Sequence, residues 1–119
     1  MSMPNFSRGD VVLVRYPVSD LTSAKVRPAV VVSSPAAQYD DVFVVPVTSQ
    51  TESLAEGEFV LSAWATAGLN VASAVKRGIL LVETTGILKK VGELTERDWT
   101  SLQESVQRWL GPPVAFHSR

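Results

Sequence analysis

Arg27 and Thr48 are the residues of this sequence whose types and spacing best suit chemistry. Each stands just outside an apolar run of strand length, and the polar segment between the two runs has the composition of a surface turn. The runs are 29–32 and 42–47, and the turn spans 35–40. A turn centred on that segment would form a hairpin in which Val30 faces Val45 and Arg27 faces Thr48. A guanidinium beside a hydroxyl, at the open end of an apolar hairpin, suits the binding of a phosphate.

RNA is the phosphate substrate for which so small a site would suffice. Its own 2′-hydroxyl can attack the adjacent phosphorus, so a protein need only position the backbone, move protons and stabilise the developing charge. Arg27 suits the last of these roles. An arginine is a poor general base, so this interpretation assigns no proton acceptor.

The sequence lacks the residues that other common kinds of catalytic centre require. The chain has no Cys and a single His, His117, in the last residues of the sequence, where chain ends fray. It therefore lacks the residues for a Ser-His-Asp or Cys-His arrangement or a histidine metal site. Asp40 and Asp41 are adjacent in the expected turn and would point apart, and no glycine-rich phosphate loop precedes a helix. We expect no cofactor and no metal.

The charge balance permits RNA binding only locally. The 119 residues carry a formal net charge of −1, without a global positive field. Basic residues gather at Lys25 with Arg27, at Lys76 with Arg77, and at Lys89 with Lys90, although a solvated surface explains any one pair equally well. From the first two of these groups we take Lys25, Lys76 and Arg77 as candidate RNA-binding residues.

The pattern of the chain predicts one small, mostly β domain over residues 1–119. The sequence predicts strands at 9–16, 58–61, 72–76, 79–84 and 88–93 beside the hairpin, a loop at 19–25, and a single turn at 64–67 closed by Gly68. A helix should span 95–110, with a capping box of Thr95 and Asp98. Its apolar face would be formed by Trp99, Leu102, Val106, Trp109 and Leu110. These elements favour a small antiparallel barrel over about 8–94, followed by the helix and a flexible tail over 111–119. The sequence shows no secretory leader or membrane-spanning run, so we expect a soluble, cytoplasmic protein.

Several segments resemble the MazF/PemK-like ribonuclease toxins of type II toxin-antitoxin systems. They are Arg8-Gly-Asp-Val-Val-Leu-Val, Val26-Arg-Pro-Ala-Val-Val-Val, Val45-Pro-Val-Thr-Ser-Gln50, Ser73-Ala-Val and Gly86-Ile-Leu-Lys-Lys-Val-Gly-Glu-Leu-Thr. Their order and spacing, rather than any one of them, carry the resemblance.

This resemblance implies an SH3-like barrel, a homodimer, metal-independent cleavage of single-stranded RNA as an mRNA interferase, and inhibition by a cognate antitoxin. Arg27 and Thr48 match the family's catalytic Arg and Thr. Ser49 and Gln50 continue the threonine motif and would line the RNA site, and Ser73 matches a position near the substrate groove. The loop 19–25 matches a mobile loop beside the site, where a disordered segment of the antitoxin would fold onto the groove and exclude RNA.

Two other functions stay open at this point. One is a gyrase-poisoning toxin of the CcdB type, which shares the barrel but would not need the pair of Arg27 and Thr48. The other is a catalytically silent SH3-like binding module, in which Arg27 is a surface cation and Thr48 an ordinary strand end.

Overall fold

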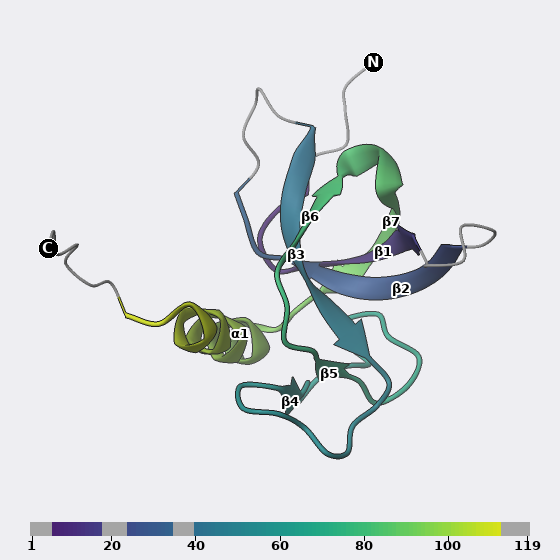
Figure 1. Cartoon of the computed structure of the whole chain (residues 1–119). Helices are drawn as coiled ribbons and strands as arrows, with labels where there is room; N and C mark the ends of the chain where they lie inside the picture. Colours follow the sequence, from purple (N-terminus) through teal and green to yellow (C-terminus); the bar gives the residue numbers. More distant parts are fainter. Residues whose placement is uncertain (1–5, 18–23, 35–39, 113–119) are drawn as a thin grey trace, which may run out of the picture.

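The computed structural model of the chain describes residues 6–17, 24–34 and 40–112. Their backbone forms seven antiparallel strands, a short 3-10 helix and a C-terminal α-helix (Figure 1). The strands are β1 (Asp10–Pro17), β2 (Ala24–Val31), β3 (Asp41–Thr48), β4 (Phe59–Val60), β5 (Ala74–Val75), β6 (Leu80–Glu83) and β7 (Ile87–Glu93), and the helices are η1 (Thr84–Gly86) and α1 (Glu96–Leu110). The predicted class, mostly β with one C-terminal α-helix, is confirmed.

Strand β3 is the centre of the sheet. On one side it pairs with β2, and on the other its first half pairs with β6 and its end with β5. Val30 lies opposite Val45, which is the register that the turn predicts. Because a slip of one residue would turn every side chain to the other face, this register decides which residues the hairpin can bring together at its open end.

The sheet curls like a barrel but stays open. Its neighbouring strands follow the order β4-β5-β3-β2-β1-β7, with β6 as an additional partner of β3. Within residues 6–17, 24–34 and 40–112, no ladder joins the two ends of this order. The expected barrel is therefore confirmed in its curvature.

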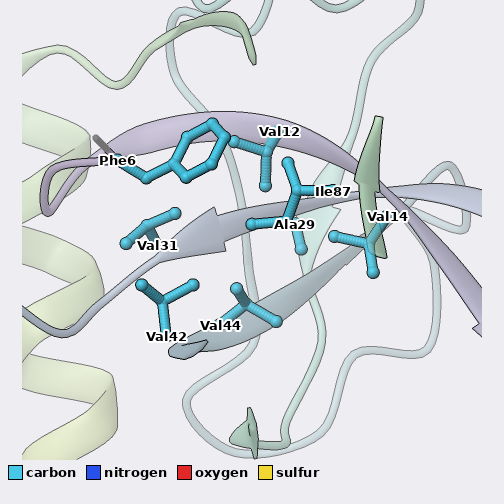
Figure 2. Close-up of a cluster of buried hydrophobic side chains, with 8 residues drawn as sticks. All are labelled: Phe6, Val12, Val14, Ala29, Val31, Val42, Val44 and Ile87. Carbon is cyan, nitrogen blue, oxygen red and sulfur yellow. The ribbon is translucent and has the colours of Figure 1, made fainter. Parts of the chain in front are cut away.

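Two apolar clusters fill the two sides of the curled sheet. Figure 2 shows the first, in which side chains from β1, β2, β3 and β7 and from the segment before β1 point toward one another: Phe6, Val12, Val14, Ala29, Val31, Val42, Val44 and Ile87. The second lies against α1 and contains Val11, Val30, Val45, Val47, Leu61, Ala67, Val75 and Leu102. Because the first three strands contribute to both clusters, their middles are apolar on both faces.

Some boundaries differ from the sequence-based expectation. Strand β2 begins at Ala24, so Ala24 and Lys25 belong to a strand instead of the predicted loop, whose remaining residues lie outside the described part. Pairing with β1 explains the extension, since Lys25 lies opposite Tyr16 and Ala24 opposite Pro17. Strands β4 and β5 have only two residues each, because they pair only with one another and with the end of β3.

Helix α1 begins and packs largely as its pattern predicts. The side chain of Thr95 accepts a hydrogen bond from the backbone N–H of Asp98 at 3.3 Å. Leu102 is buried, and Trp99, Val106 and Trp109 pack against the second cluster. Leu110 is the exception: it is the last residue of α1 and is 72% exposed.

The side chain of Asp98 corrects the capping-box prediction. Instead of returning to the start of its own helix, its carboxylate accepts hydrogen bonds from Ser62 N, Ser62 Oγ and Ala63 N at 3.0, 2.8 and 3.1 Å. Asp98 is 3% exposed, so these bonds replace its hydration. They tie α1 to the predicted single turn, which Gly68 closes with φ +90°. In the described part of the chain, no helix is both long and apolar enough to cross a membrane.

Candidate active site

A cleft of about 850 Å³ opens beside the first half of β2 and the end of β3. Its walls come from β1, β2, β3 and β7 and from the segment before β5. The lining residues are Leu13, Val26, Arg27, Pro28, Val47, Thr48, Ser49, Gln50, Gly68, Leu69, Asn70, Val71, Ser73, Lys89, Lys90 and Val91. The cleft thus brings together five of the eight residues that the sequence singles out: Arg27, Thr48, Ser49, Gln50 and Ser73.

Arg27 lies on β2 with its side chain exposed to solvent. Its Nη1 donates one long hydrogen bond, 3.3 Å, to the carbonyl oxygen of Val26. Within the described residues no carboxylate lies within ion-pair distance of its guanidinium. Most of its donors therefore remain available to an anion entering the cleft.

Thr48 is the last residue of β3, and its hydroxyl is already oriented. Its Oγ1 accepts a hydrogen bond from the backbone N–H of Gln50 at 3.1 Å. This local turn uses a lone pair of the oxygen and leaves the hydroxyl proton free to donate. Ser49 and Gln50 follow with exposed side chains, so the end of β3 presents a short polar edge to the cleft.

The hairpin register explains why Arg27 and Thr48 share a cleft. Ala29 lies opposite Pro46 on the paired strands, and continuing that register by two residues on each strand places Arg27 opposite Thr48. Facing residues of an antiparallel pair project from one side of the sheet. The geometry can thus present a guanidinium and a hydroxyl to one phosphate.

Ser73 lines the cleft but is structurally engaged. It is 3% exposed, and its Oγ donates a 2.9 Å hydrogen bond to the carbonyl oxygen of Val71. Its own carbonyl oxygen accepts from Leu61 N at 2.9 Å. The described contacts of Ser73 hold the 69–73 segment in place.

Lys25, Lys76 and Arg77 lie outside the lining of the cleft. The backbone N–H of Arg77 donates to a carboxylate oxygen of Glu58 at 2.8 Å, and that of Ala55 donates to the other at 2.7 Å. The bond from Arg77, followed by the one from Ala55, lowers the pKa of Glu58 below its usual value. The backbone of the second basic pair therefore helps to fix a loop.

The opposite wall of the cleft holds residues that sequence reasoning did not assign to the site: Asn70, Val71, Lys89 and Lys90. The pair of lysines is visible in the sequence, but nothing there distinguishes it from a solvated surface. Asn70 belongs to an irregular segment without periodicity. No sequence motif marks this wall, and only the fold brings its residues together.

The two lysines of this wall differ in their electrostatic partners. The ammonium of Lys90 lies 2.8 Å from Glu93 Oε1 and 3.2 Å from Asp10 Oδ1. Hydrogen bonds to Glu93 and then to Asp10 raise the pKa of Lys90, and the same contact lowers the pKa of Glu93. In the described chain, Lys89 makes no comparable ion pair.

Two glycines allow the walls to meet. A Cβ at Gly92 would lie 2.2 Å from the carbonyl oxygen of Ala67, and one at Gly68 would lie 2.1 Å from that of Val91. These are backbone atoms that cannot move aside, so only glycine permits so close an approach. The contact sets the segment carrying Asn70 directly against β7.

The sequence of residues 7–110 matches the family model of the PemK-like, MazF-like toxins of type II toxin-antitoxin systems. A search of curated proteins found no significant match.

Solved structures share the fold at low sequence identity. An endoribonuclease from a mycobacterial species matches with a TM-score of 0.72 and 19% identity over 97% of this chain and 100% of the other. A mycobacterial endoribonuclease in complex with its cognate antitoxin matches with a TM-score of 0.68 and 18% identity, over 92% and 99%. A MazE-MazF complex from Deinococcus radiodurans gives 0.73 and 17%, over 91% and 97%.

Proposed function

Because the chain belongs to the PemK-like, MazF-like family of type II toxins, we propose that it is a toxin that cleaves single-stranded RNA in the cleft of Arg27 and Thr48. The observation that carries the proposal is the placement of these two side chains at the open end of one hairpin, on one cleft, with free donors on both. The family match favours a toxin over a silent binding module, and the described structural neighbours are endoribonucleases or MazF proteins instead of gyrase poisons.

In the proposed reaction the 2′-oxygen of one nucleotide attacks its own 3′-phosphorus, and the bond from phosphorus to the 5′-oxygen of the next nucleotide breaks. The products are a 2′,3′-cyclic phosphate and a 5′-hydroxyl. Arg27 donates to the non-bridging oxygens, where negative charge develops, and the Thr48 hydroxyl donates to the same phosphate. Neither a carboxylate nor an imidazole is among the lining residues of the described chain, so we assign to water both the removal of the 2′-proton and the return of a proton to the departing 5′-oxygen.

The cleavage test uses two substrates. We expect the purified protein to cut a defined single-stranded RNA in the presence of a chelator, because the proposed chemistry uses only cationic and hydroxyl side chains. The same RNA with hydrogen in place of the 2′-hydroxyl at the cleaved nucleotide should stay intact. Cleavage of the deoxy substrate at that position would refute the proposal.

The proposal includes two protein partners. A type II toxin has a protein antitoxin, and we place its binding over the cleft, where it would exclude RNA. A second copy of the chain is the other partner, for which the outer face of β3 and β6 offers apolar surface. Phe43 and Leu81 lie opposite each other there and are 46% and 58% exposed. The proposed site of action is the cytoplasm, where cellular RNA is available.

A further inference from the structure

We propose that the wall of the cleft formed by Asn70, Val71 and Lys89 binds the nucleotide next to the cleaved bond, with Lys89 on its phosphate and Asn70 on its base. This inference rests on the proposed function, because it assigns an RNA to the cleft. It adds positioning and specificity residues on segments remote from the catalytic hairpin.

The sheet places Lys89 at a suitable distance from Arg27. Lys89 lies opposite Leu13 on β1, and Leu13 lies opposite Pro28 on β2. A row of facing residues therefore runs across three strands from Lys89 to Pro28, and Arg27, the residue before Pro28, reaches the same cleft from the other face of β2. Two strand spacings separate the backbones of β7 and β2 by roughly 10 Å. The two cations are thus suited to successive phosphates of one strand.

The charges of the wall favour Lys89 over its neighbour for this role. Lys90 already interacts with Asp10 and Glu93, so binding a phosphate there would compete with two carboxylates. Lys89 is exposed and has no ion-pair partner within residues 6–17, 24–34 and 40–112. A solvent-exposed ammonium group such as this one gains a counter-charge when it contacts an RNA phosphate.

Asn70 and Val71 provide a complementary surface for a base. The exposed carboxamide of Asn70 offers both donors and an acceptor, as reading of a base edge requires. Val71 is 54% exposed beside it, an apolar surface on which a base can lie. Leu69 N donates to Trp64 O at 3.1 Å, and Leu61 N donates to Ser73 O at 2.9 Å. Both ends of the segment are therefore fixed, which is what a specificity element needs.

The first experiment measures binding separately from cleavage. A mixed-sequence single-stranded RNA with 2′-fluoro sugars lacks the nucleophile and stays intact. Its affinity is measured between 50 and 200 mM salt for the parent, Lys89→Gln and Arg97→Gln. Arg97→Gln removes one positive charge from an exposed position on α1, outside the cleft. Loss of one phosphate contact lowers the salt slope by about 0.7, so the affinity deficit of Lys89→Gln should shrink about 2.6-fold over this range. Arg97→Gln should keep the parent slope.

The second experiment reads specificity. Sites cut in a natural RNA mixture are sequenced for the parent and for Asn70→Ala, and preference at one position flanking the cleaved bond should relax by roughly fivefold or more. Equal salt slopes for Lys89→Gln and Arg97→Gln, unchanged preference in Asn70→Ala, or no binding of the RNA by the parent would each overturn the inference. A parent that binds through Lys89 but leaves ordinary RNA intact would refute the proposed function and support this binding wall.

Discussion

The substitution Arg27→Lys separates charge stabilisation during cleavage from simple attraction of RNA. Lysine keeps the positive charge and the alkyl stem but loses the planar fork that can grip two phosphate oxygens. If Arg27 only attracts RNA, the variant should cleave almost as fast as the parent. If Arg27 stabilises the charge that develops at phosphorus, cleavage should fall much more than binding.

The structure sets the expected size of both effects. Removing one well-aimed donor from an oxyanion site usually lowers the rate by roughly 10²- to 10³-fold. The cleft is open and Arg27 exposed, so solvent screens its field and we expect the lower end, about 10²-fold. The folded state should lose less than about 0.5 kcal/mol, since the only hydrogen bond found for this guanidinium in the described chain is 3.3 Å long and solvent-exposed.

The effect on catalysis is measured as the single-turnover cleavage rate, and the effect on binding as the affinity for the 2′-fluoro RNA, both at one salt concentration. Lys25→Gln serves as the control, because it removes a charge on the same strand but outside the cleft lining. It should lower affinity slightly and leave the single-turnover rate unchanged. An Arg27→Lys variant that cleaves at the parent rate would remove Arg27 from the catalytic role.

Asp98→Ala should destabilise the fold by roughly 2–3 kcal/mol in urea titrations, because three part-buried donors lose their buried, charged acceptor; a loss below about 1 kcal/mol would contradict this role. Leu81→Asp should convert the proposed dimer to a monomer in sedimentation at micromolar concentration, whereas Leu54→Asp, a charge at an exposed leucine of a loop, should sediment as the parent does. The folded-state pKa of Glu58 is lowered, so the stability it confers is present above its ordinary pKa, near 4.5, and is lost as pH falls through the lower folded value. The difference in melting temperature between the parent and Glu58→Gln should therefore be constant from pH 6 to 8 and shrink below pH 4.5; a constant difference down to pH 3 would refute the assignment.

Local patterns explain why much of the fold could be predicted. The hairpin register follows from two apolar runs and the length between them, and the structure has Val30 opposite Val45 as expected. The start of α1 follows from Thr95, whose hydroxyl caps the helix. Both features depend on residues close together in the sequence, where spacing and geometry are nearly equivalent.

Long-range contacts explain what the sequence did not reveal. Asp98 fits a capping box by its spacing, but its carboxylate bonds to residues 62 and 63. Leu110 fits the apolar stripe of α1, yet within the described residues its side chain is 72% exposed. The sequence pattern correctly identifies Asp98 as a residue with a specific hydrogen-bonding role and Leu110 as part of an apolar stripe. Tertiary contacts then decide which groups Asp98 binds and whether Leu110 is buried.

The same distinction between local patterns and long-range contacts applies to the candidate site. Arg27 and Thr48 could be paired in advance because one hairpin carries both, whereas the facing wall joins residues 70–71 to Lys89 through two glycine contacts and an anchor on α1. The anchor acts in sequence: Asp98 holds the turn at 62–63, that turn ends at Gly68, and Gly68 rests against Val91 on β7. A change at Asp98 that leaves the chain folded should therefore alter base preference through Asn70 before it alters the rate of cleavage through Arg27. The catalytic hairpin and the wall that selects the base would then be separable by mutation, because the hydrogen bonds that hold them belong to different parts of the fold.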